Sequence, residues 1–384
     1  MAWRSVWLIF YSSLLRRESA IVCKNLALLS NPSLINRMKI MPALNVTPNN
    51  KQYQVETVQF DSETSFTLAC SPQIKLLPAN GGIRWRQYGS RQQQECEAVM
   101  LAQRMSLKHG LYNTGFSGGK IVVNSPHLPA QQPDVMAAIG ELLNRYNGTM
   151  FTGCDINTSN EDMDYLRRFT PWILNAMDSP QIDTSIATGY GVWSSIHKVI
   201  ALRLPHIARP VVAIHGMGKV GSEVARQCLS HGCDVVGYDL NPRAVFPEGV
   251  RRVDETQLFE QPSHVLCIAS LSGILNSDNV TQVNTHWVVS SANSPFNSPV
   301  AEDVLMARGV HYLPDYVSNA GAVICDSIEM AFTERYNQMS QDQVNAYVYS
   351  VIGAKTEELL QRAALLFCEV GRLLQPVKSA LLVA

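Results

Sequence analysis

The sequence lacks the features that mark several classes of protein. Charged residues make up only 16% of its 384 residues and the formal net charge is -1, so no charge excess attracts nucleic acid. It has no basic run interleaved with aromatic residues, no internal repeat and no low-complexity tract. The apolar run VWLIFY near the start is too short to span a bilayer. With 46% hydrophobic residues, we expect a globular protein that acts on a small molecule, with no nucleic-acid or membrane partner.

The cysteines and histidines lack the spacings of disulfide frameworks and metal sites. Nine cysteines run from Cys23 to Cys368 without a CxxC pair, which is typical of reduced thiols and predicts a cytoplasmic protein. The nine histidines form no metal-spaced pair, and no Ser-His-Asp pattern emerges. We therefore expect neither a metal nor a covalent nucleophile.

The first 40 residues differ in composition from the rest of the chain. Residues 1–40 are rich in Arg, Ser and Leu, with Glu18 as the only acid, as in an organellar transit peptide. No small-residue cleavage site follows their apolar run, which argues against secretion. The favoured alternative is a start codon assigned too early, with translation beginning at Met38 or Met41. In either case the segment stands apart from the fold.

Beyond Met41, the pattern of apolar residues predicts two α/β domains. In the first half, short β-type runs such as VETVQF and KIVV alternate with helical patterns such as QECEAVMLAQRMSLKHG. A loop-like stretch at 173–185 then precedes a helical segment that ends before Pro205. We predict one domain over 41–185, a second over 186–335, and C-terminal helices over 336–384.

The second half opens with a glycine-rich turn in the setting of a dinucleotide-binding fold. A strand from Val211 to Ile214 runs into Gly216, Gly218 and Gly221, and a helix follows. The first glycine permits a tight turn, the second lets the backbone approach a pyrophosphate, and the third lets the helix pack on the strand. The alternative, incidental turn glycines, does not explain this order. The predicted cofactor contacts of this loop are Gly216, Met217, Gly218, Lys219, Val220 and Gly221.

Asp239 indicates which dinucleotide is bound. It ends the next β-type run, DVVGYD, about twenty residues after the glycines. A carboxylate there hydrogen-bonds the adenosine ribose 2′-hydroxyl and repels a 2′-phosphate, which favours NAD over NADP. Arg243 lies close enough in sequence to oppose that preference.

Several stretches, taken together, resemble the Glu/Leu/Phe/Val amino-acid dehydrogenase family. They fall in family order from Gly81 to the last helices, and they are GGIRW, RMSLKHGLYNTGFSGGK, TGCDINTSNEDMDYL, ATGYGVW, GMGKVG, SSANSPF and PDYVSNAGAVICDSIEM. The chain is most similar to the leucine, phenylalanine, valine and tryptophan branch. The resemblance implies a substrate-binding, catalytic and oligomerisation domain over 41–185, a Rossmann NAD-binding domain over 186–335, and an active cleft between them. It also implies a homo-oligomer, with the C-terminal helices returning to the first domain.

The resemblance assigns roles to three charged residues. Lys108 matches the family lysine in MxxK that binds the substrate carboxylate, and Lys120 matches the lysine, twelve residues on, that does acid-base work. Asp155 matches the aspartate that shuttles protons. Oxidative deamination needs these groups, since it requires a cation for the carboxylate, a base near neutrality and a proton carrier. Two lysines in one cleft depress each other's pKa, so one can be neutral. Glycines 118 and 119 are expected to keep the floor beside Lys120 open.

Other site positions follow from the same resemblance. It implies backbone contacts from Gly81 and Gly82 to the substrate, and a place for Met105 in the side-chain pocket, where core packing is the alternative. The expected contacts of the nicotinamide or the substrate are Thr188, Asn293 and Asn319.

Two positions that set substrate choice in the family are unusual here. Asn80 stands where glutamate-specific relatives have a lysine, and Asp326 stands three residues after Val323 in the pocket segment. A carboxylate in the pocket predicts poor use of glutamate, mediocre use of leucine and valine, and a preference for a side chain with a hydrogen-bond donor. The alternative is that Asp326 turns away to cap a helix or pair with an arginine.

The predicted function is an NAD-dependent L-amino-acid dehydrogenase that reversibly forms a 2-oxo acid and ammonia. Ser117, Ser294 and Ala322 depart from the family pattern without removing a catalytic group. One alternative is a non-catalytic NAD-linked regulatory homologue, but the three charged residues are retained. The other is a 2-hydroxy-acid dehydrogenase, which usually relies on a His-carboxylate pair, and none stands out in the sequence.

Overall fold

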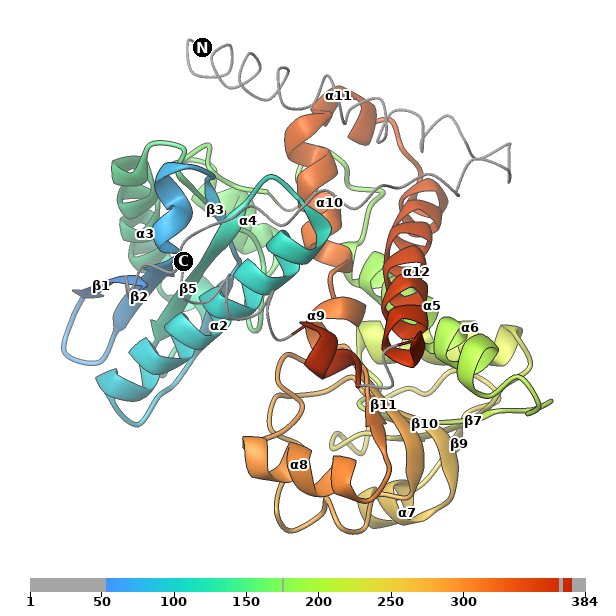
Figure 1. Cartoon of the computed structure of the whole chain (residues 1–384). Coiled ribbons are helices and arrows are strands. Elements are labelled where there is room, and N and C mark those ends of the chain that lie inside the picture. Colours follow the sequence, from blue (N-terminus) through green and yellow to red (C-terminus); the bar gives the residue numbers. More distant parts are fainter. Residues whose placement is uncertain (1–52, 175, 366–368, 375–384) are drawn as a thin grey trace. The chain divides into compact units, whose positions relative to one another are not determined.

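The computed structural model describes residues 53–174, 176–365 and 369–374, which fold into two β-sheets with helices (Figure 1). The segment 1–40, with its two interpretations, lies outside the described residues. The strands of the first sheet are β1 (Gln54–Gln59), β2 (Ser65–Cys70), β3 (Ala79–Asn80), β4 (Ile83–Arg86), β5 (Ser117–Asn124) and β6 (Met150–Phe151). Those of the second are β7 (Val211–His215), β8 (Asp234–Tyr238), β9 (Arg251–Arg252), β10 (Ser263–Ile268), β11 (Thr285–Ser290) and β12 (His311–Tyr312). The α-helices are α2 (Arg91–Tyr112), α3 (Pro133–Tyr146), α4 (Asn160–Leu166), α5 (Thr184–Arg203), α6 (Lys219–Ser230), α7 (Glu255–Glu260), α8 (Pro299–Ala307), α9 (Asp315–Ser318), α10 (Gly321–Ala331), α11 (Thr333–Tyr336) and α12 (Gln341–Leu365).

The first sheet places β5 between neighbours on both edges. Its order is β1-β2-β5-β3-β6, with β4 also paired to β5. β2 runs antiparallel to β5 and sets Ala69 opposite Lys120, while β3 and β4 pair with β5 in parallel. Because β3 ends opposite Gly118 and β4 begins opposite Ile121, the glycine pair 81–82 interrupts that edge beside Lys120.

The two faces of this sheet have different cores. Ile121 and Val123 of β5 pack with Ile139 of α3 in one apolar cluster. Val122 packs with Ala102 of α2 in another. Because successive strand residues point to opposite faces, Lys120 shares the face of Val122, beneath α2. α2 begins at an N-cap where the Ser90 side chain accepts from the Gln93 amide.

Gly118 does not keep space open beside Lys120, contrary to the expectation from the sequence. A Cβ at Gly118 would lie 2.1 Å from the Ala102 carbonyl oxygen and 2.4 Å from the Ser106 amide nitrogen, both in the backbone of α2. At Gly119 it would meet the Met150 sulfur at 2.5 Å. The glycines are therefore needed because α2 and Met150 fill that space, and the close packing brings α2 down onto the strand that carries Lys120.

The second sheet has the topology predicted for the nucleotide-binding half. Its six strands are all parallel in the order β12-β11-β10-β7-β8-β9. The order reverses between β7 and β10, and ligands of open parallel sheets bind beyond the carboxyl ends of the strands at such a switch point. The glycine loop follows β7 there. The helices α12 and α10 both pack against α5 (Figure 1).

Two further observations concern the described residues as a group. Six of the described cysteines, Cys70, Cys96, Cys228, Cys233, Cys267 and Cys325, are free thiols, which is consistent with the interpretation of the cysteine pattern. Among these residues, no helix is long and apolar enough to cross a membrane.

Candidate functional site

Lys120 and Asp155 form a close ion pair on the first sheet. Lys120 Nζ lies 2.7 Å from Asp155 Oδ2, and the lysine side chain is only 7% exposed. Lys120 comes from the middle of β5, while Asp155 follows β6 in a turn where its amide donates to Thr158 Oγ1. Arg84 Nε reaches the same Oδ2 at 2.8 Å, and its Nη1 contacts Glu97 Oε1 at 2.7 Å.

The electrostatics of this pair suit acid-base chemistry. Burial lowers the pKa of the Lys120 amine, the charge of Asp155 opposes that shift, and the charge of Arg84 adds to it. For Asp155, burial alone raises the carboxyl pKa, but Lys120 and Arg84 outweigh it and hold the pKa well below its usual range. Asp155 is therefore ionised near neutrality, and Lys120 can change protonation more easily than an exposed lysine.

Lys108 is a second buried cation on α2. Burial lowers its pKa to about 8, with Lys120 adding to the shift and Asp315 opposing it. The sequence predicted that two lysines in a partly desolvated cleft depress each other's pKa. In the structure burial is the larger cause for both, and the cation that adds to the shift at Lys120 is Arg84.

Of the glycine pair beside Lys120, Gly81 has a backbone amide that is already hydrogen-bonded within the protein. The Gly81 amide donates to the Phe151 carbonyl, and the Gly81 carbonyl accepts from Thr152 Oγ1. Gly82 is half-buried, and a Cβ there would lie 2.4 Å from the Cys154 carbonyl oxygen. Of the two glycines, Gly82 is the better candidate for a backbone contact with substrate.

The two unusual specificity positions meet each other. Asn80 Nδ2 donates to Asp326 Oδ2 at 2.7 Å. Asp326 lies inside α10 rather than at its end, and it forms no ion pair with an arginine among the residues that the structure describes. Burial raises the pKa of Asp326 to about 8, and repulsion from Glu329 adds to the shift. Val323 is buried one turn earlier on α10, and Met105 is half-buried on α2. The carboxyl of Asp326 is thus largely neutral at pH 7.

The glycine loop after β7 has the geometry predicted for a dinucleotide site. Gly216 has φ of +101°, and a Cβ at Gly221 would lie 1.9 Å from the Gly216 carbonyl oxygen, so the helix does pack tightly on the turn. At Gly218 a Cβ would meet nothing within 4 Å, which leaves open space at the N-terminus of α6. Met217 is buried, Val220 is half-buried, and Lys219 Nζ lies 3.4 Å from Asp183 Oδ2. These residues fit a pyrophosphate at the start of α6.

Asp239 lies where β8 ends, beside an open cavity of about 500 Å³. Its two carboxylate oxygens accept from the Met217 amide at 2.7 Å and the Asn241 amide at 2.8 Å. Arg252, which the sequence analysis missed, lines this cavity and places its guanidinium 4.7 Å from the centre of the Phe246 ring. Arg243 is exposed. The cation that shares this cavity with Asp239 is therefore Arg252 of β9 rather than Arg243, which is nearer to Asp239 in sequence.

The three residues predicted near the nicotinamide lie at the ends of β11, α9 and α5. Asn319 Nδ2 donates to the Ser291 carbonyl and to Asn293 Oδ1, whereas Asn319 Oδ1 is buried without a partner among the described residues. A carboxamide ligand can donate to that oxygen, which fits a nicotinamide. Thr188 Oγ1 donates to the Thr184 carbonyl, and a Cβ at Gly321 would lie 2.5 Å from the Thr188 Cα.

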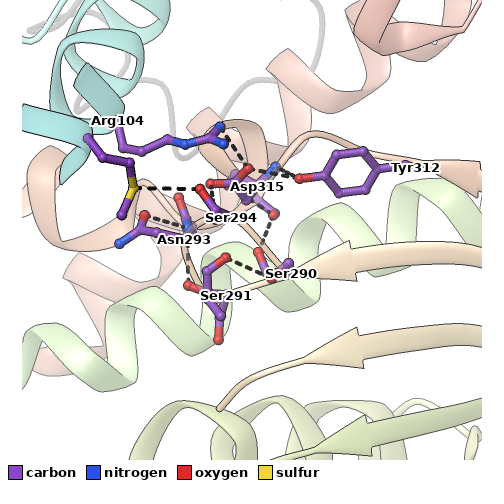
Figure 2. A network of polar contacts seen from close by, with 11 residues as sticks. Arg104, Ser290, Ser291, Asn293, Ser294, Tyr312 and Asp315 are labelled. Atoms are coloured by element: carbon purple, nitrogen blue, oxygen red, sulfur yellow. Dashed lines mark hydrogen bonds and ion pairs between the residues drawn. The ribbon is translucent and has the colours of Figure 1, made fainter. Parts of the chain in front are cut away.

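A buried aspartate that the sequence analysis did not single out organises the neighbouring loop (Figure 2). Asp315 Oδ1 contacts Arg104 Nη1 at 3.2 Å and accepts from Tyr312 Oη at 2.8 Å. Its Oδ2 accepts from the amide of Ser294, a residue with φ of +50°. Asp315 therefore holds a left-handed turn where the family pattern has an asparagine, a residue that adopts this backbone more readily. The larger cavity, of about 1550 Å³, is lined by Arg104, Ser294 and Asp315 but by none of Lys108, Lys120 and Asp155.

His-carboxylate pairs, which the sequence did not reveal, do occur. His215 Nε2 lies 2.9 Å from Glu255 Oε1, and His215 Nδ1 lies 2.7 Å from Ser270 Oγ. The imidazole is buried on β7 and stacks on Phe259, so both ring nitrogens are engaged within the nucleotide-binding sheet. A second pair, His311 with Glu369, is surface-exposed in part. Neither pair contacts Lys120 or Asp155.

Family models match most of this chain. Residues 67–171 match the dimerisation domain of Glu/Leu/Phe/Val dehydrogenases, and residues 239–367 match the Glutamate/Leucine/Phenylalanine/Valine dehydrogenase model. Residues 180–286 match the NAD-binding domain of D-isomer specific 2-hydroxyacid dehydrogenases. The last match agrees with the parallel sheet and the glycine loop.

Individual relatives agree with these matches. A valine dehydrogenase from Streptomyces coelicolor is 31% identical over 263 residues, 65% of this chain and 71% of the relative. A phenylalanine dehydrogenase from Caldalkalibacillus thermarum is 27% identical over 268 residues, 66% of this chain and 72% of the relative. Among solved structures, L-tryptophan dehydrogenase from Nostoc punctiforme superposes with a TM-score of 0.66 at 22% identity, covering 86% of this chain and 95% of that one. That likeness concerns the fold.

Proposed function

The chain belongs to the Glu/Leu/Phe/Val dehydrogenase family, and on that premise we propose that it is an NAD-dependent L-amino-acid dehydrogenase. The reaction is the reversible oxidative deamination of an L-amino acid to the 2-oxo acid and ammonia. The observation that carries the proposal is the ion pair of buried Lys120 with half-buried Asp155, with Lys108 near enough to be affected by both charges. These are the groups that the reaction requires.

Each charged group has one task in this reaction. Lys108 binds the substrate α-carboxylate, which in turn favours the charged form of its amine. When bound, NAD would supply the acceptor for the hydride of the substrate Cα. Asp155, which is ionised, takes a proton from the substrate ammonium group before the hydride leaves. Lys120, once neutral, takes a proton from the water that attacks the resulting imine, and Asp155 returns its proton to the nitrogen that departs as ammonia. Burial of both lysines keeps competing water away and strengthens these interactions.

NAD is held by residues at the carboxyl ends of β7, β8 and β11. The loop 216–221 and the start of α6 bind the pyrophosphate, and Asp239 binds the adenosine ribose. The open space at Gly218 and the unpartnered Asn319 Oδ1 support this placement. Asn293 and Thr188 complete the nicotinamide end.

Asp239 is expected to set the preference for NAD over NADP. Asp239→Ser removes a charged hydrogen-bond acceptor and a repulsive charge, so the ratio of kcat/KM for NAD to that for NADP falls by about 10- to 100-fold. Asp254→Ser is the matched control, because it removes a neighbouring carboxylate from the same cavity and retains a helix-capping side chain. A wild-type enzyme that prefers NADP would mean that Arg252 governs the site.

The proposed function is tested by NADH formation with panels of L-amino acids and 2-hydroxy acids. We expect turnover with amino acids, ammonia as a product, and none with hydroxy acids. Turnover with hydroxy acids alone would replace the proposal by the second enzyme class, for which the match of residues 180–286 is the supporting observation. NAD binding without any turnover would identify a regulatory homologue.

Assembly into a homo-oligomer is part of the proposal. Among the described strands, β1 lies at the edge of the first sheet and pairs with β2 alone, and the family model over 67–171 describes a dimerisation domain. An unpaired edge strand offers backbone groups to a second copy. Light scattering at micromolar concentration is expected to give a mass of at least two chains, whereas a monomer would contradict this assignment.

The cellular location is also part of the proposed function. We propose that the protein is cytoplasmic, on the basis of the cysteine pattern in the sequence.

A further inference from the structure

Arg84 bridges two carboxylates directly behind the proposed catalytic pair. Its side chain is 6% exposed, its Nε lies 2.8 Å from Asp155 Oδ2, and its Nη1 lies 2.7 Å from Glu97 Oε1. A buried arginine on an apolar strand requires such partners, since an unpaired buried charge is strongly unfavourable. Arg86 approaches the other oxygen of Glu97 only at 3.9 Å and is half-exposed.

The register of the strands explains why Arg84 reaches Asp155. Arg84 of β4 pairs with Val122 of β5, and Val122 lies on the same face as Lys120 because it is two residues further along. Two neighbouring strands therefore point a guanidinium and an ammonium at one carboxylate. Both cations contact the same oxygen, Oδ2.

We propose that Arg84 is a positioning residue for the deamination proposed above, on which this inference rests: it fixes Asp155 through Oδ2, and Oδ1 exchanges the proton with the substrate nitrogen. Glu97 fixes Arg84 in turn from α2. A planar guanidinium can donate to two carboxylates in fixed directions, whereas the ammonium of a lysine is a point charge on a flexible stem. The geometry at Asp155 therefore depends on arginine specifically.

The charge of Arg84 has a second effect, on Lys120. The charged groups around Lys120 are Asp155 from the turn after β6, Arg84 from β4, and Glu97 and Lys108 from α2. Arg84 lowers the pKa of Lys120, while Asp155 and Glu97 raise it. Since the water-activating step needs neutral Lys120, kcat/KM for deamination rises with pH through the Lys120 titration. Loss of Arg84 moves that rise to higher pH, and loss of the charge of Glu97 moves it to lower pH.

Three variants separate geometry from charge. Arg84→Gln removes both the geometry and the charge. We expect kcat to fall about 10²-fold, as for a misplaced catalytic group. We also expect the midpoint of the rise in kcat/KM to move about 1 pH unit higher. Arg84→Lys keeps the positive charge but cannot donate to two carboxylates in fixed directions. We therefore expect kcat to fall while the pH at which kcat/KM rises stays at the wild-type value. Glu97→Gln is expected to move the midpoint of the rise in kcat/KM to lower pH, opposite to the effect of Arg84→Gln. Arg91→Gln, which breaks the exposed pair with Glu95, is the control and leaves both quantities unchanged.

An independent measurement distinguishes this inference from the proposed function. The pH dependence of Lys120 acetylation by acetic anhydride, read by mass spectrometry, reports the lysine titration without turnover. If the wild-type enzyme turns over no amino acid, the proposed function fails, and the acetylation curve of Arg84→Gln still tests its electrostatic effect. The inference is overturned if either Arg84 variant keeps the wild-type kcat. It is also overturned if Arg84→Gln folds and its acetylation of Lys120 has the same pH dependence as in the wild type. If Arg84→Gln does not fold, the kcat of Arg84→Lys and the direction of the Glu97→Gln shift decide.

Discussion

Replacing Lys120 by alanine is expected to lower kcat by roughly 10²- to 10⁴-fold or more, the usual effect of losing a general acid-base group. The Lys120 amine lies 2.7 Å from Asp155 Oδ2, and alanine leaves neither an amine nor that contact at this position. NAD binding is expected to remain nearly intact, because the predicted cofactor contacts lie on the second sheet and on α5. Stopped-flow single turnovers and a fluorescence titration of NADH measure the two effects separately.

A matched lysine shows whether the effect is specific. Lys198 of α5 also forms an ion pair, with Glu357 of α12 at 2.6 Å, but it is not among the predicted site residues. Lys198→Ala is expected to keep turnover within a few-fold of wild type. A Lys120→Ala enzyme that retained a tenth of the wild-type kcat would rule out Lys120 as the base.

Asp326 is expected to decide which side chain the enzyme accepts. Asn80 occupies one oxygen of Asp326, and burial holds the pKa near 8, so the group is mainly neutral at pH 7 and ionised at pH 9. At pH 9, where Asp326 is a carboxylate, glutamate is expected to be a very poor substrate and leucine and valine mediocre, whereas a side chain with a donor, such as an indole N–H or a cation, is preferred. The disadvantage of glutamate relative to leucine grows as pH rises through 8, because a carboxylate repels a carboxylate.

Kinetics on wild type and Asp326→Val with Glu, Leu, Phe, Trp, Lys and Arg test this assignment. At pH 9, where wild-type Asp326 is ionised, the variant is expected to prefer leucine, with kcat/KM ratios between donor-bearing and aliphatic substrates changed by about 10- to 100-fold, the worth of a hydrogen bond to a charged group. The pH dependence of the Glu-to-Leu ratio is expected to disappear in the variant. A wild-type enzyme fastest on leucine, with the same ranking in Asp326→Val, would show that Asp326 does not contact the substrate side chain.

Local sequence patterns were sufficient for the fold and for the positions of the main groups. The strand-loop-helix order around 211–221 predicted β7, the glycine turn and α6, because each of these depends on neighbours in the chain. The helix that carries Lys108 and the strand that carries Lys120 were likewise readable from periodicity. The assignment of catalytic roles came from the family resemblance, and those roles remain predictions.

The partners of these groups could not be read from the sequence. Arg84 is 71 residues from Asp155, and Asn80 is 246 residues from Asp326, so only the folded chain brings either pair together. The role of Gly118 was misjudged for the same reason, since the atoms that exclude a side chain belong to α2 rather than to the strand. One signal was available for Arg84, because a charged residue in a buried strand needs a counter-charge.

The position of Lys120 in β5 has a consequence for the dynamics of the enzyme. β5 has hydrogen-bonded neighbours on both edges and a helix packed on the face that carries the lysine. Strands of this kind exchange their amide hydrogens only when the whole sheet opens, whereas edge elements fray at little cost in free energy. The amides of β5 that face its neighbouring strands are therefore expected to exchange slowly, most evenly along the edge paired with β2. Hydrogen exchange is expected to be slower in β5 than in the edge strand β1, so the side chain proposed as the base stands on one of the more stable parts of the first sheet.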